Sequence, residues 1–284
     1  MRTLLCLVLL ATVRLCWAAG DTANYPAYEL DKVDTPIDLS EYTLIWSDEF
    51  DLLNASRPGR GSGHWFTGGH AVLASGEKMA HVPDPAYSIV SGVLQMVTRT
   101  DPVDSKRVEA HLQTNDGKAT SVSFQDGYLE TRMWVPAARG SHAGLWLLSE
   151  EKGGGHVEID VVETYGTGDP SVHAATHVWP IRPLVHRSNS KRVVKQDIFA
   201  GFHLYGVLAT DSHFIFYYDR KEICRIARLL EQRVPMYLLL SVFGNPTQPL
   251  IEPATMQVDY VRIYAPKRTP RPPVVYEPQP PATR

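Results

Sequence analysis

Short runs of alternating apolar and polar residues dominate this chain from Tyr42 onward, and turn residues separate each run from the next. Successive side chains of a β-strand point to opposite faces, so an alternation of period two predicts a strand with one buried face. Residues 127–135 show it clearly, because Tyr128, Glu130, Arg132 and Trp134 alternate with Leu129, Thr131, Met133 and Val135. The pattern predicts a β-rich domain.

Turn signals join several of these runs into hairpins. Residues 87–97 are two apolar runs around Ser91-Gly92, and residues 213–218 precede the turn-like Asp219-Arg220-Lys221. The only helical candidate is the short segment 226–232, and no fixed-length repeat is present. Many short strands with regular turns are typical of an all-β sandwich.

Length and composition agree with one such domain. The chain has 284 residues, of which 44% are hydrophobic, and β-sandwiches often run to about 200–250 residues as a single domain. The formal net charge of −3 gives no electrostatic reason to expect nucleic acid, which needs a basic face. We expect a monomer that binds no nucleic acid.

The amino terminus has the features of a secretory signal. Met1-Arg2 precedes an apolar run at residues 4–13, and Ala18-Ala19 supplies small residues for cleavage. Arg14 interrupts the run before it is long enough to span a membrane, although an uncleaved anchor is the alternative. We therefore predict a signal peptide at residues 1–19, and a secreted, extracellular or cell-wall protein with no membrane association after cleavage.

The remaining chain divides at Pro266. Residues 20–266 form the predicted folded domain, and residues 267–284 are proline-rich without hydrophobic period, as expected of an extended, disordered tail. An attachment to a cell wall or a partner is the alternative for the tail. Removing the signal leaves Cys224 as the one cysteine, in an apolar run where a buried role is expected.

The candidate chemistry lies in His156-Val157-Glu158-Ile159-Asp160-Val161-Val162-Glu163. Its β-branched residues favour a strand, on which Glu158 and Asp160 share a face. One bulged residue between Asp160 and Glu163 would return Glu163 to that face. Like charges so close disfavour each other's ionisation, and glycoside hydrolysis uses such a pair, with one carboxylate and one protonated acid. An acidic edge strand or a solvated loop is the alternative.

Glu158-Ile159-Asp160-Val161-Val162-Glu163 resembles the bulged E-x-D-x-x-E signature of glycoside hydrolase family 16. The resemblance covers about residues 40–266 and includes, in the family's order, the segments 45–51, 127–132, 145–148, 202–207, 235–240 and 258–264. It implies a β-jelly roll of two antiparallel sheets with a concave cleft. It also implies a retaining endo-β-glycosidase, with Glu158 as nucleophile, Glu163 as acid/base and Asp160 orienting Glu158. No cofactor is needed for that catalysis.

Histidine and tryptophan residues supply candidates for sugar binding. His173, His177 and Trp179 share one face of a predicted strand, and the family has a similar histidine-containing strand there. Because sugars present apolar C–H faces, aromatic rings often line glycan clefts. The predicted substrate-binding residues are Trp146, His177, Trp179, Trp65 and Trp134, with a core or structural role as the alternative for each.

Two further acids match positions at which many family members hold a structural calcium. These are Glu49 and Asp259, and calcium prefers several hard oxygen ligands. An ordinary hydrogen-bonded acid is the alternative at each position. A structural calcium ion is therefore the one metal that the resemblance predicts.

The sequence identifies the substrate less closely than it identifies the family. The laminarinase branch usually reads W-P-A-F-W-L-L before the acids, whereas this chain has His142-Ala143-Gly144-Leu145-Trp146-Leu147-Leu148, with Val157 in place of a glycine. We expect a polysaccharide substrate, first a β-1,3- or mixed β-1,3/1,4-glucan and then an agarase-type galactan. A transglycosylase would use the same three acids, and a glycan-binding module without activity would share the fold.

Overall fold

The computed structural model describes residues 35–61, 63–68, 77–150, 155–179, 186–245, 248–251 and 253–267. The predicted signal peptide and residues 268–284 of the predicted tail lie outside the described residues. The elements in chain order are η1 (Leu39–Glu41), β1 (Tyr42–Asp48), β2 (Ala55–Ser56), β3 (Trp65–Thr67), β4 (Lys78–Met79), β5 (Tyr87–Val90), β6 (Val93–Thr100), β7 (Arg107–Gln113), β8 (Ser123–Phe124), β9 (Gly127–Trp134), β10 (Ser141–Ser149), β11 (His156–Thr164), β12 (Ser171–Trp179), β13 (Arg187–Val194), β14 (His203–Ala209), β15 (His213–Tyr218), β16 (Lys221–Ala227), η2 (Leu230–Gln232), β17 (Met236–Gly244) and β18 (Ala254–Pro266).

The prediction of an all-β jelly roll is confirmed, and both predicted hairpins form as β5–β6 and β15–β16. The predicted helix at 226–232 is wrong. Ile226 continues β16 and pairs with Phe214 of β15, so only the short 3-10 helix η2 remains. The reason is burial, because Ile226 and Phe214 both lie in the core and tertiary packing overrides a weak local preference.

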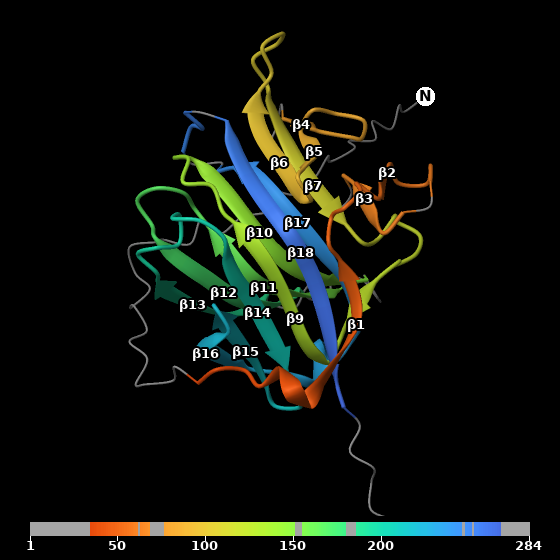
Figure 1. Cartoon of the computed structure of the whole chain (residues 1–284), viewed down its shortest axis with the longest axis vertical. Coiled ribbons are helices and arrows are strands. Elements are labelled where there is room, and N and C mark those ends of the chain that lie inside the picture. Colours follow the sequence, from red (N-terminus) through yellow and green to blue (C-terminus); the bar gives the residue numbers. More distant parts are fainter. Residues whose placement is uncertain are drawn as a thin grey trace, which may run out of the picture.

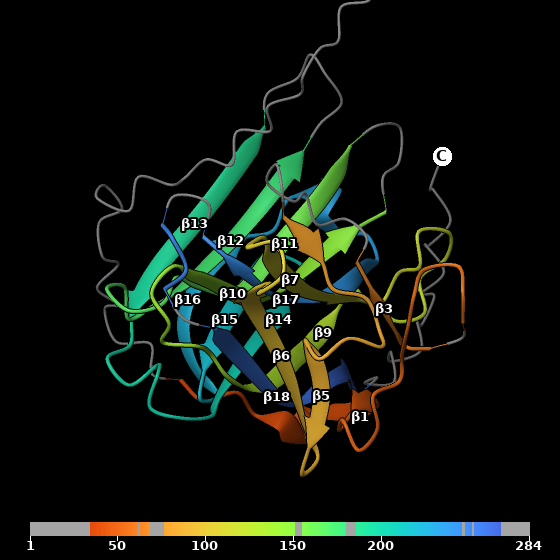
Figure 2. The same cartoon turned by 90° about the horizontal axis from the view of Figure 1, so that it is seen from above.

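Two antiparallel sheets pack face to face. The inner sheet has the strand order β13-β12-β11-β10-β17-β7-β3, and Figure 2 shows β13, β12 and β11 side by side in it. The outer sheet runs β16-β15-β14-β9-β18, with β1 and β6 both paired to the long strand β18 (Figure 1). Strand β6 also pairs with β7 at Arg99 and Val108, which joins the two sheets at that end.

The core fills the space between the sheets with alternate residues of both. In the inner sheet, Leu145 and Leu147 of β10 and Leu238 and Leu240 of β17 are fully buried in it. The residues between them in sequence point to the opposite face of the inner sheet, which we name the site face. Burial on one face therefore fixes which side chains of β10, β11, β12 and β17 reach the site face.

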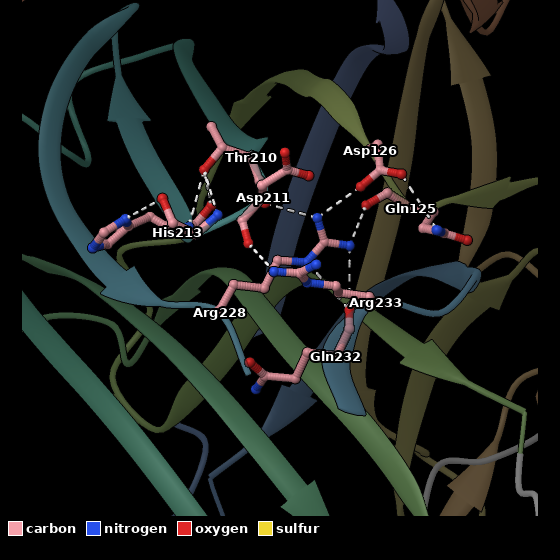
Figure 3. Close-up of polar contacts among 9 residues, drawn as sticks. Gln125, Asp126, Thr210, Asp211, His213, Arg228, Gln232 and Arg233 are labelled. Carbon is pink, nitrogen blue, oxygen red and sulfur yellow. Dashed lines mark hydrogen bonds and ion pairs between the residues drawn. The ribbon is translucent and has the colours of Figure 1, made fainter. Parts of the chain in front are cut away.

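A buried arginine fixes the end of the outer sheet. Arg228, which follows β16, donates to Oδ1 of Asp126 at 2.7 Å, to the carbonyl oxygen of Thr210 at 2.9 Å and to that of Gln125 at 3.0 Å (Figure 3). These groups precede β9 and follow β14, so one guanidinium ties together segments distant in sequence. The charge is compensated by Asp126, as a buried cation requires.

Candidate active site

Strand β11 (His156–Thr164) carries the three predicted acids on the site face, because its apolar residues Ile159 and Val162 are buried in the core. Asp160 pairs with Ala175 of β12 and Glu163 pairs with His173, so β11 advances by three residues while β12 advances by two. This is the predicted bulge, and it is confirmed. The bulge returns Glu163 to the face that holds Glu158 and Asp160.

Different side chains hold Glu158 and Asp160. The indole Nε1 of Trp179 donates to Oε2 of Glu158 at 2.6 Å, and Nε2 of His177 lies 3.0 Å from Oδ2 of Asp160. Asp160 and Glu158 also share a hydrogen bond. His177 in turn bonds through Nδ1 to Nε2 of His186 at 3.0 Å. The middle acid is therefore linked to the first acid and to a pair of histidines.

Glu163 is held on the other side, by β10. Nε2 of His142 lies 2.8 Å from Oε1 of Glu163, and Tyr165 also hydrogen-bonds to this glutamate. The ring of His142 stacks on Tyr165 with the ring centroids 4.8 Å apart. The carboxyl group of Glu163 is thus fixed by groups that do not contact Glu158.

Burial and mutual repulsion separate the proton affinities of the three acids. Burial, with the charge of Asp160 next in effect, raises the pKa of Glu158 to about 8. Burial, followed by the charge of Glu163, holds the pKa of Asp160 well above its ordinary value. Burial acts on Glu163 too, but the hydrogen bond and charge of His142 together with His173 and His177 bring the pKa of Glu163 below its ordinary value. The row therefore holds protonated and ionised carboxyl groups side by side.

Three of the predicted sugar-binding residues lie on the site face. His177 and Trp179 of β12 contact the acids directly, and Trp146 of β10 pairs in register with Asp160. Nε1 of Trp146 donates to Oγ of Ser241 at 3.1 Å. One face of the Trp179 ring is stacked by His186 at 3.6 Å between centroids, so that face is covered. All three therefore lie beside the acids, and sugar binding by them stays a prediction.

The structure places the other two tryptophans elsewhere, which corrects the prediction for them. Trp65 of β3 is fully buried, with Nε1 donating to Oδ2 of Asp48 at 2.9 Å, so it is a core residue. Trp134 lies in β9 of the outer sheet and donates to the carbonyl oxygen of Phe199. Its alternation partner Met133 fills the core, so Trp134 points away from both the core and the site face.

His173 lies beside Glu163, but its hydrogen-bond partner is a different acid, Asp169. Its Nε2 is 2.6 Å from Oδ2 of Asp169, and Arg192 of β13 donates to Oδ1 of the same aspartate at 2.6 and 3.0 Å. The hydrogen bonds from His173, Arg192 and Ser171 outweigh partial burial and lower the pKa of Asp169. His173 therefore supports the site electrostatically and is fixed by Asp169.

Sequence reasoning missed His142, Tyr165 and His186. A signal for His142 existed, because residues 142, 144 and 146 share one face of a strand and Trp146 was already assigned to the cleft. The hairpin register then sets Gly144 opposite Glu163. No comparable pattern pointed to Tyr165 or His186, since both lie outside the strands.

The predicted calcium ligands are both engaged by arginines. Glu49 receives two hydrogen bonds from Arg262, at 2.8 and 2.9 Å, and Asp259 receives one from Arg132 at 2.8 Å. A calcium ion would have to displace these guanidinium groups, so the carboxylates as they lie do not fit it well. Among the described residues no group of three or more His, Cys, Asp or Glu side chains is arranged to hold a metal. The calcium ion stays a prediction.

The described part of the chain also contains no helix that is both long and apolar enough to span a membrane. Cys224, the cysteine of the predicted domain, is free and buried, as expected. Burial raises the pKa of its thiol to about 12, which is the state of an unreactive core cysteine.

The fold and site together define a class of protein, a jelly-roll sandwich with a row of carboxyl groups on one bulged strand. The sequence profile of glycosyl hydrolases family 16 matches residues 86–262, and the chain belongs to this family.

The named relatives are β-glycanases and a galactosidase. Endo-1,3-1,4-beta-glycanase ExsH of Rhizobium meliloti (strain 1021) is 28% identical, over 90% of this chain and 60% of that protein. Keratan-sulfate endo-1,4-beta-galactosidase of Sphingobacterium multivorum is 27% identical, over 81% of this chain and 57% of that protein. The solved structure of SCLam, a non-specific endo-beta-1,3(4)-glucanase, superposes with a TM-score of 0.66 at 21% identity, over 82% of this chain and 95% of that chain. The chain thus spans under two thirds of the two relatives' lengths, and the SCLam structure supports the fold.

Proposed function

We propose that this protein is an endo-β-glucanase that hydrolyses its polysaccharide with retention of configuration. The observation that carries the proposal is the row on β11, in which the bulge aligns Glu158, Asp160 and Glu163 and a different side chain holds each one. A retaining glycosidase needs two such carboxyl groups on one surface, one to attack and one to carry the proton.

Each acid has a role that its contacts support. Glu158 attacks the anomeric carbon, and the N–H group of Trp179 stabilises its carboxylate form. Glu163 gives its proton to the departing oxygen and later removes a proton from water. In the reactive arrangement, in which Glu158 is ionised, Asp160 keeps its proton because burial raises its pKa, donates through the hydrogen bond that the two acids share and keeps the nucleophile oriented.

The substrate we propose is a β-1,3- or mixed β-1,3/1,4-glucan. Similarity to the Rhizobium meliloti glycanases supports a glucan. Similarity to a keratan-sulfate galactosidase and the histidine at position 142 keep an agar-type galactan as the second candidate. Release of reducing ends, compared across laminarin, lichenan, agarose and carrageenan, distinguishes the two. We further propose secretion as a monomer, which rests on the amino-terminal sequence pattern and the single domain.

The test of the mechanism separates the two glutamates. Glu158→Ala should abolish hydrolysis, and azide should restore turnover with an inverted product, because it attacks the anomeric carbon directly. Glu163→Ala should still cleave substrates with a good leaving group in the first step, and azide should rescue the second step with retained configuration. Asp160→Ala should lose a factor of about 10²–10³, as for other groups that stabilise charge in the site.

The product configuration is read by NMR during the first turnovers, with circular dichroism of each variant to establish folding. Hydrolysis of polysaccharide at the parent rate by either glutamate variant would refute the assignment. Wild-type protein that binds these glycans but releases no reducing ends, and transfers no glycosyl group to added sugars, would instead indicate a binding module.

A further inference from the structure

Glu163 has two opposite tasks if the proposed function holds, and the role inferred for its neighbour His142 rests on that function. In the first step Glu163 must be a carboxylic acid, and in the second it must be a carboxylate. Its side chain is only 21% exposed, and burial favours the neutral form. A group that stabilises the carboxylate is therefore needed, or the second step stalls.

The contacts of His142 suit it to stabilise the carboxylate form of Glu163. Its Nε2 lies 2.8 Å from Oε1 of Glu163, and the residue is 8% exposed. The ring stacks on Tyr165 at an interplanar angle of 18° and meets Phe243 of β17 edge-on at 6.3 Å. Two aromatic rings and the strand β10 hold this imidazole, and with it the direction of Nε2. That direction is toward Glu163.

The other titratable groups around Glu163 are committed elsewhere. On β11 Asp160 is its acidic neighbour, and Tyr165, which follows the strand, adds a neutral hydroxyl. On β12, His173 bonds to Asp169 and His177 bonds to Asp160. Phe243, which faces His142 from β17, carries no charge. His142 is thus the basic side chain among the described residues that bonds to the carboxyl group of Glu163 itself.

We propose that His142 is the positioning residue of the acid/base, which holds Oε1 of Glu163 and stabilises its carboxylate in both steps. In the first step Glu163 gives its proton to the glycosidic oxygen while the bond to the anomeric carbon breaks and Glu158 forms its own bond to that carbon. In the second step water attacks the anomeric carbon, its proton passes to Glu163, and Glu158 departs as a carboxylate. His142 donates to the negative charge that Glu163 bears between these events.

Two variants isolate this role. His142→Phe keeps a ring to stack on Tyr165 but removes the nitrogen, and His142→Gln keeps a neutral donor. The substrates are the polysaccharide and a 2,4-dinitrophenyl glycoside of an oligosaccharide from it, whose leaving group needs no acid. Removing a hydrogen bond to a charged active-site group is expected to lower the rate by about 10–100-fold.

For His142→Phe we expect a loss of about 10–100-fold in kcat/KM on the polysaccharide, because the loss of the contact that positions Oε1 outweighs the larger fraction of protonated Glu163. We expect kcat/KM on the dinitrophenyl glycoside to be nearly unchanged. On the latter substrate kcat should fall by a similar factor and a burst of dinitrophenol should appear, because the second step becomes limiting. The loss of kcat should shrink as pH rises, since Glu163 without its donor needs a higher pH to ionise. His142→Gln should recover part of the activity.

A His–carboxylate pair in the outer sheet gives the matched control. His203 lies 2.9 Å from Asp219, and His203→Phe should leave all these parameters at their parent values. Equal losses of kcat/KM on both substrates, without a burst, would show that His142 only supports the fold or binds sugar, and would overturn the inference. Its failure is distinct from failure of the proposed function, because the wild-type enzyme and Glu163→Ala would still behave as described above.

Discussion

Replacing Trp179 by phenylalanine tests how the carboxylate form of the nucleophile Glu158 is stabilised. The indole N–H donates to Oε2 of Glu158 at 2.6 Å, whereas phenylalanine keeps a ring that can stack on His186. Hydrogen bonds to charged groups contribute about 1.5–3 kcal/mol, and each 1.36 kcal/mol corresponds to a factor of ten in rate. Trp179→Phe should therefore reduce kcat/KM by about 10–100-fold. It should do so on the dinitrophenyl glycoside as well as on polysaccharide.

The pH dependence of kcat/KM should change in a definite direction in the Trp179→Phe variant. Glu158 must be ionised to attack, and its pKa is raised to about 8, so kcat/KM on the dinitrophenyl glycoside, whose leaving group needs no acid, should rise with pH through that range. The indole hydrogen bond lowers this pKa, so Trp179→Phe should move the acidic limb of kcat/KM on the dinitrophenyl glycoside to higher pH. Trp146→Phe is the control, because that indole donates to the neutral hydroxyl of Ser241. A Trp179→Phe enzyme with the parent kcat/KM and an unmoved acidic limb would refute the reasoning.

Two further predictions concern stability. Burial raises the pKa of Glu158 from an ordinary 4.5 to about 8, so the contribution of this residue to stability is present below pH 4.5 and is lost as pH rises toward 8. At pH 8 the Glu158→Gln variant should therefore melt at a higher temperature than the parent in calorimetric scans, and the difference should shrink toward pH 5. Equal melting temperatures at every pH would contradict the prediction. Because Arg262 and Arg132 engage Glu49 and Asp259, excess chelator should leave the melting temperature unchanged; a lower melting temperature in chelator, with calcium found by elemental analysis, would instead support the calcium ion that the resemblance predicts.

The sequence predicted the catalytic strand well because period two and burial leave little freedom there. Once Ile159 and Val162 are assigned to the core, a bulge is the one local change that brings Glu163 back beside Asp160. The same logic placed His177 and Trp179 correctly on β12. In each case apolar residues at alternate positions determined the face.

The error at Trp134 arose because the environment of that residue depends on which sheet its strand joins. Trp134 and Trp146 both sit in alternating strands, yet β9 joins the outer sheet and β10 the inner sheet. Alternation tells which residues share a face but not which face borders the site. His142 was missed for a related reason, since its contact with Glu163 depends on the register between β10 and β11 and is invisible in either strand alone.

The proton distribution in the row explains why both of its ends need a partner. At rest, Glu158 and Asp160 hold protons while Glu163 is ionised against His142. The reactive arrangement has an ionised Glu158, a protonated Asp160 and a protonated Glu163, so it contains the same number of protons. Conversion moves one proton along the row and requires none from solvent. Trp179 favours that move by stabilising the carboxylate of Glu158, and His142 opposes it by stabilising that of Glu163. The balance between these two hydrogen bonds therefore sets the fraction of enzyme that is ready to react.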